Sequence, residues 1–192
     1  MKTQDLTRCA LFVALITAGA FIRIPLPYIP ITLQVTFVSL AGMLLGGKRG
    51  AIACAAYMVL GLVGVPIFTQ GGGIGYLAQP TFGYIIGFVF GAWLTGAIVD
   101  RYENPSYRQL VLASLAGIAV IYAFGLVYFY CIKNFYLDSA TSLWTVFFYG
   151  FLTCIPGDVA MTFVGAYVAK RLMPVARGTN RKVAKAEPES CD

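Results

Sequence analysis

Histidine is absent from this 192-residue chain, and charged residues make up only 11% of it. Soluble domains carry about 25% charged residues, so this chain has too little polar surface to face water. Its mean hydropathy is +0.77 and 59% of its residues are hydrophobic, which predicts an integral membrane protein. The lack of histidine excludes histidine metal sites and histidine acid–base catalysis.

Several sequence signatures are also missing. None of the five cysteines forms a C-x-x-C pair, and we expect no metal site and no cofactor. No G-K-[ST] motif is present, which excludes ATP binding by a P-loop. The net charge of +6 is not accompanied by a zinc-finger, helix-turn-helix or RRM signature, so we expect no nucleic-acid partner. No small-residue cleavage site follows the first apolar run, which we therefore interpret as a transmembrane helix.

Six apolar segments approach the length of about 20 residues that crosses a bilayer. They lie at residues 8–24, 31–47, 50–68, 80–99, 109–132 and 143–172. The predicted fold is an all-α integral membrane protein with six transmembrane helices in one domain, residues 1–175. We expect the remainder, 176–192, to be a disordered basic tail.

The basic residues alternate between the connections of these six segments. The N-terminus, the second and fourth connections and the tail hold 12 of the 14 Lys and Arg residues, whereas the other three connections hold Arg23 and Lys133 alone. Cytoplasmic loops carry such an excess of positive charge. The pattern predicts a multi-pass membrane protein with both termini in the cytoplasm.

Asp158 is the one acidic residue inside an apolar segment, TCIPGDVAMTFVG. A carboxylate there costs a few kcal/mol unless it faces the bundle interior and has partners. We expect Pro156 and Gly157 to interrupt the last segment, with Asp158 in the first turn of a new helix. The residue is either a helix cap at the membrane interface or an acceptor that faces a ligand.

The stretch TQGGGIGYLAQPTFGYIIGF at 69–88 contains a G-x-G-x-x-A pattern. A dinucleotide-binding pattern must follow a strand, open a helix and be followed by an acidic residue about 20 positions later, and this loop between membrane helices does not fit. We expect the uncharged loop 66–79 to close over a small ligand with the backbone of Gly72, Gly73 and Gly75. The alternative is a flexible connector.

Polar side chains near the outer ends of two helices are further candidates. Gln79 and Tyr84 flank the start of the fourth segment, and Gln34 begins the second. Tyr84 is alternatively an interfacial anchor, and Gln34 a partner in a hydrogen bond between helices. Glycines at 83, 87 and 91 have the small-x-x-x-small spacing of close helix packing.

The glycine run with Q-P-T-F-G-Y-I-I-G-F, the early P-I-T-L-Q-V-T and the late P-G-D resemble the BioY family, over about residues 8–172. That resemblance implies a six-helix S component of an energy-coupling factor (ECF) transporter, which binds biotin and has no ATPase activity of its own. It also implies a location in the bacterial plasma membrane and assembly with a transmembrane coupling protein and two cytoplasmic ATPases. The docking surface for the coupling protein would be the A-x-x-x-A stripe of Ala10, Ala14 and Ala18.

Biotin offers two ureido N–H donors, one carbonyl, an apolar thioether ring and a valerate carboxylate. We expect Asp158 to accept from an N–H, and Gln79 or Gln34 to address the carbonyl. The apolar ring would pack on Phe82, Tyr84 or Trp93, and the carboxylate would reach Arg23 or the amides of Gly72–Gly75. The alternative function is a stand-alone secondary transporter or facilitator of a vitamin-like solute. An intramembrane enzyme is disfavoured because the sequence shows no nucleophile–base pair.

Overall fold

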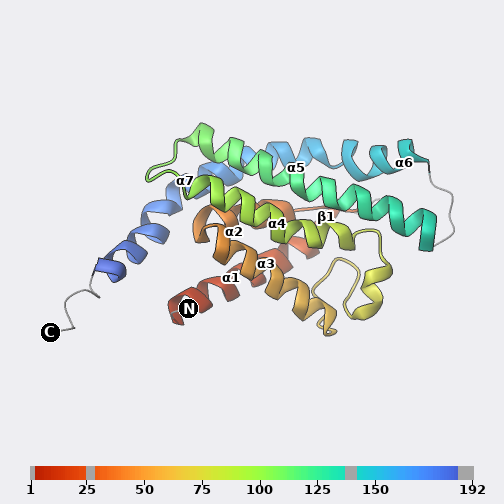
Figure 1. Ribbon diagram of the computed structural model, residues 1–192, viewed down its shortest axis with the longest axis horizontal. Helices are drawn as coiled ribbons and strands as arrows, with labels where there is room; N and C mark the ends of the chain where they lie inside the picture. The colour runs from red at the N-terminus through yellow and green to blue at the C-terminus, as the bar shows by residue number, and fades with distance from the viewer. Residues whose placement is uncertain (1–2, 25–28, 137–141, 186–192) are drawn as a thin grey trace.

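The computed structural model describes residues 3–24, 29–136 and 142–185. Helices dominate it (Figure 1), and the two short strands form one antiparallel hairpin in which Arg23 pairs with Thr32. In chain order the elements are α1 (Thr3–Phe21), β1 (Arg23–Ile24), β2 (Ile31–Thr32), α2 (Gln34–Leu45), α3 (Gly47–Leu62), η1 (Ile74–Ala78), α4 (Phe82–Val99), α5 (Tyr107–Cys131), η2 (Ile132–Tyr136), α6 (Leu143–Phe147), η3 (Phe148–Leu152) and α7 (Ile155–Lys185).

Among the residues that the structure describes, four helical stretches are long and apolar enough to cross a membrane: Thr3–Phe21, Phe82–Val99, Tyr107–Asn134 and Leu143–Pro174. Their outward faces are apolar, as lipid requires; Leu112 and Val127, for example, are 65% and 66% exposed. α2 and α3 are shorter than predicted, because the start of the second segment forms the hairpin and the end of the third enters a loop.

The two ends of the bundle differ. In Figure 1 the start of α1, the end of α7 and the α4–α5 connection lie at one end, whereas the loop containing η1, the end of α5 and the start of α6 lie at the other. The predicted inner and outer connections are thus separated along the bundle. We call the end away from the termini the outer end.

α2 is the central helix, and its residues from Val38 to Leu45 are all buried. It packs against α1, α3, α4 and α7. A helix that is apolar all round is stable only when neighbours enclose it.

Glycines allow the helices to approach closely. The predicted packing stripe of Gly83, Gly87 and Gly91 faces α5; a Cβ added at Gly87 would lie 2.9 Å from the Cα of Ile121. At the inner end, a Cβ at Gly96 would lie 2.6 Å from the carbonyl carbon of Gly46. Backbones meet at these points, as in other small-x-x-x-small contacts.

The last apolar segment is interrupted, as predicted. α6 leads into η3, a π-helical turn, and α7 begins at Ile155, so Pro156 and Asp158 lie in its first turn. The helix then continues to Lys185, whereas the sequence suggested an unstructured tail from 176. Residues 186–192 of that tail lie outside the described part of the chain.

We predict that Gly96→Ala destabilises the protein by about 1–3 kcal/mol, the usual cost of overfilling a packed interior. The added methyl group would press on the Gly46–Gly47 backbone, which has no rotamer to change. A lower Tm in detergent would measure the effect. Gly75→Ala is the matched control, because a Cβ there meets nothing within 4 Å; equal losses in both variants would contradict the packing argument.

Candidate functional site

A cavity opens at the outer end of the bundle, with about 570 Å³ of free space including its mouth. Its apolar walls include Ile29, Val35, Ile85 and Phe88, contributed by the hairpin, α2 and α4. Its polar lining residues are Thr32, Gln34, Thr69, Tyr76, Thr81, Tyr84, Tyr122 and Asp158.

Asp158 is the acidic residue of this lining and is only 6% exposed. The start of α7 places it in the cavity wall, where the Tyr122 hydroxyl of α5 donates a 2.6 Å hydrogen bond to its Oδ2. Among the described residues, Oδ1 has no hydrogen-bond partner. The carboxylate is therefore held from one side and retains acceptor capacity for a ligand.

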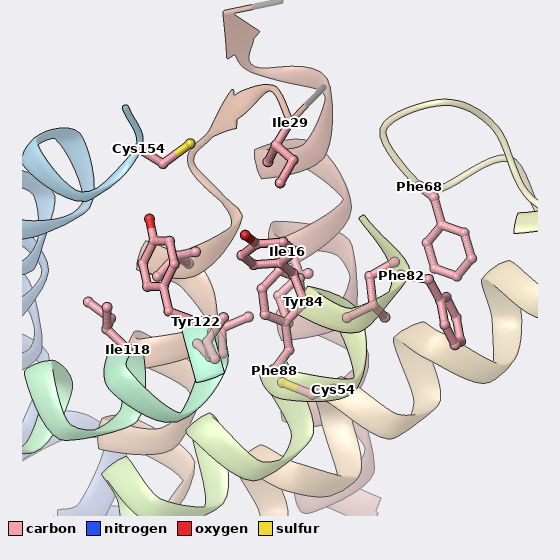
Figure 2. Packing of buried hydrophobic residues seen from close by; sticks show 14 of the residues in the cluster. Ile16, Ile29, Cys54, Phe68, Phe82, Tyr84, Phe88, Ile118, Tyr122 and Cys154 are labelled. Atoms are coloured by element: carbon pink, nitrogen blue, oxygen red, sulfur yellow. The ribbon is translucent and has the colours of Figure 1, made fainter. Parts of the chain in front are cut away.

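Tyr84 stands next to Tyr122, and the two rings meet edge to face with centroids 5.8 Å apart. Figure 2 shows the pair below Cys154, another residue of the cavity wall. The Tyr84 hydroxyl donates a 2.7 Å hydrogen bond to the carbonyl oxygen of Gly150 in η3. Tyr84 thus supports the interrupted segment that leads to Asp158.

Gln34 lines the cavity and is 4% exposed. Its Nε2 donates a 2.8 Å hydrogen bond to the Tyr57 hydroxyl of α3. That hydroxyl in turn donates a 2.9 Å hydrogen bond to the carbonyl oxygen of Ile67. The predicted hydrogen bond between helices is present, and Gln34 also faces the cavity.

The loop between α3 and α4 supplies a chain of hydroxyl groups. The Tyr76 hydroxyl lies 2.8 Å from Thr69 Oγ1 and 3.0 Å from Thr81 Oγ1. All three residues line the cavity. Because each hydroxyl can donate and accept, this wall can pair with either kind of polar atom.

The glycines of the loop shape it and do not line the cavity. Gly73 has a φ of +100°, which favours glycine, and its N–H donates 2.7 Å to the Gly61 carbonyl at the end of α3. A Cβ added at Gly72 would clash with backbone carbonyl groups, since it would lie 3.0 Å from the carbonyl oxygen of Gly61. Gly75 is exposed. The run therefore lets the loop fold back on α3.

The remaining predicted site residues also lie outside the cavity lining. Gln79 is half-buried beside η1, and Phe82 packs its ring on Tyr128. Trp93 is 51% exposed on the outward face of α4, which leaves no reason to keep it in the site. Arg23 is exposed on β1, where its guanidinium donates to the Thr69 carbonyl and ties the hairpin to the loop.

Sequence reasoning missed several residues that the fold brings to the site. Tyr122 and Cys154 come from apolar segments, and Thr69, Tyr76 and Thr81 come from within or beside the glycine loop. The tyrosine and threonines of the loop were visible as polar atoms in an otherwise apolar stretch. No local signal marks Tyr122, since a tyrosine in a membrane helix has the same pattern when it faces lipid headgroups.

Comparisons with known proteins agree with this architecture. The model of the BioY family matches residues 1–178. The chain belongs to the BioY family.

Among relatives of this BioY chain, a probable biotin transporter of Lysinibacillus sphaericus is 43% identical over 98% of this chain and 97% of its own length. A biotin transporter of Thermotoga maritima is 37% identical over 88% of this chain and 95% of its own. A similar crystal structure is that of the S component for biotin from an ECF-type ABC transporter. It has a TM-score of 0.76 and 27% identity, and the match covers 90% of this chain and 94% of the other.

We predict that Tyr84→Phe in this BioY chain lowers the free energy of unfolding by about 1–3 kcal/mol, because the buried Gly150 carbonyl loses its donor. Tyr128→Phe is the matched control. It also removes a tyrosine hydroxyl that donates to a carbonyl, that of Leu77, but in an exposed position where water can replace it. Thermal unfolding in detergent measures both, and the site argument fails if Tyr128→Phe costs as much as Tyr84→Phe.

Proposed function

We propose that this chain is the biotin-binding S component of an ECF-type transporter, which captures biotin at the outer face of the cell membrane. The observation that carries the proposal is the buried Asp158 in the wall of the outer cavity. Family membership and the similarity to an S component for biotin support it.

The chemistry of biotin suits the cavity lining. Asp158 accepts a hydrogen bond from a ureido N–H, and each further buried polar atom of the ureido ring requires a partner of its own. Tyr84, Ile85 and Phe88 give the thioether ring an apolar surface. The valerate carboxylate then extends toward Arg23, whose guanidinium donates to the carbonyl of Thr69, a residue of the cavity wall.

For partners, we propose a transmembrane coupling protein that carries two cytoplasmic ATPases. Ala10, Ala14 and Ala18 are all exposed and follow one face of α1. Small residues at spacing four allow a second helix to approach closely. This stripe supports docking through α1, at a surface separate from the biotin cavity.

We expect Asp158→Asn to weaken biotin binding by about ten- to a hundredfold, because a hydrogen bond to a charged acceptor contributes about 1.5–3 kcal/mol. Isothermal titration calorimetry of the purified protein measures the affinity. Glu103→Gln is the control, since it makes the same change at an exposed residue of the α4–α5 connection. Unchanged affinity in Asp158→Asn would remove Asp158 from the site.

For the docking stripe, Ala14→Trp should abolish copurification with the coupling protein while leaving biotin binding intact. The bulky ring would hold a partner helix away from α1. Ala123→Trp places the same ring on an exposed position of α5 and should leave assembly unchanged. If Ala14→Trp assembles as well as the parent, docking uses another surface.

A further inference from the structure

The orientation of the Gln34 amide is determined by its neighbours. Tyr57 is 0% exposed, and its hydroxyl donates to the carbonyl oxygen of Ile67, which can only accept. The single hydroxyl proton is thereby used, so the Tyr57 oxygen can only accept from Gln34. The end of the amide that faces Tyr57 is therefore its NH₂ group, 2.8 Å away.

The other end of the amide is an acceptor that faces the ligand space. Gln34 lines the cavity and Tyr57 does not, so the atom turned away from Tyr57, Oε1, is the one presented to the cavity. Among the described residues, Oε1 accepts from the Thr32 hydroxyl at 3.5 Å, a distance at the outer limit of a hydrogen bond. A carbonyl oxygen has two lone pairs, so capacity remains for a ligand N–H.

Asp158 is arranged in the same way on another side of the cavity. One of its oxygens accepts from Tyr122, while the other has no partner among the described residues. Two acceptors of the cavity lining, one on α2 and one on α7, are thus each held by a tyrosine hydroxyl on the other side of the group. A ligand with two N–H donors on different edges, which is the pattern of a cyclic urea, can pair with both.

We propose that Tyr57 is a positioning residue that turns the oxygen of Gln34 into the cavity, so that Gln34 and Asp158 each accept one of the two ureido N–H groups. This inference rests on the proposed function. It changes the role of Gln34, which the sequence suggested as a donor to the ureido carbonyl. The hydroxyls of Tyr76 and Thr81, which line the same cavity, are left as donors for that carbonyl.

The test compares biotin with its two lactam analogues, in each of which one ureido N–H is replaced by CH₂. The exchange removes a single donor with little change in shape. The parent protein should bind each analogue about tenfold or more weakly than biotin, by calorimetric titration. If both analogues bind as tightly as biotin, the pair of acceptors is wrong.

The variants then assign each acceptor. In Tyr57→Phe the amide is free to turn, so discrimination should fall toward onefold for one analogue only. In Asp158→Leu, which removes the second acceptor itself, discrimination should fall for the other analogue. A merely structural role of Tyr57 would weaken biotin and both analogues by the same factor, and that outcome would overturn the proposal.

Gln34→Leu tests the same acceptor without changing Tyr57, because it removes the acceptor oxygen itself. It keeps the proposal testable if Tyr57→Phe folds poorly. It should lose discrimination against the same analogue as Tyr57→Phe, and the double variant should lose no more than either alone, since both act through one oxygen. Additive losses would overturn the proposal. Failure of the parent protein to bind biotin would instead disprove the proposed function.

Discussion

The hydrogen bond from the Tyr122 hydroxyl to Asp158 is the contact on which the outer half of the bundle depends. A carboxylate inside a membrane protein is tolerated only with partners, and this one lies where a transmembrane segment is interrupted. The interruption gives α7 a new first turn, and the carboxylate is favoured there by the helix dipole. Tyr84 holds the π-helical turn before it through Gly150, so α4 and α5 together fix the wall that carries the charge.

The two ends of the bundle are packed with different residues. The outer core cluster is rich in aromatic side chains such as Tyr57, Phe68 and Phe129, whereas the buried residues of the inner cluster are mainly Ala, Leu, Met and Val, together with Cys9 and Phe12. Small side chains and glycines bring the inner helices into backbone contact. Large rings and hydroxyls at the outer end surround the cavity. A closely packed inner end therefore supports an outer end that is open to a ligand.

The sequence was sufficient for the parts of the fold that follow from hydrophobicity and helix rules. It predicted the apolar segments, the interruption before α7 and the position of Asp158, because burying a charge and placing a proline each allow few solutions. It also contained the information to exclude Trp93. That residue follows Gly91 by two positions, roughly 200° around the helix, so it points away from the α5 contact that Gly91 makes. Tyr57 and Tyr122 were beyond prediction because the direction of a hydroxyl depends on which helices become neighbours.

The glycine run is part of the resemblance to the BioY family, yet its glycines do not line the cavity themselves. Gly71 and Gly73 have positive φ angles, and the Gly73 amide is already paired with Gly61. A paired amide has no donor left for a carboxylate or phosphate, so the backbone of that residue cannot serve as a ligand cradle. What the tight turns achieve is to fold the loop back on α3, so that the hydroxyls of Thr69 and Tyr76 reach the cavity. The glycines thus contribute to recognition by placing other side chains.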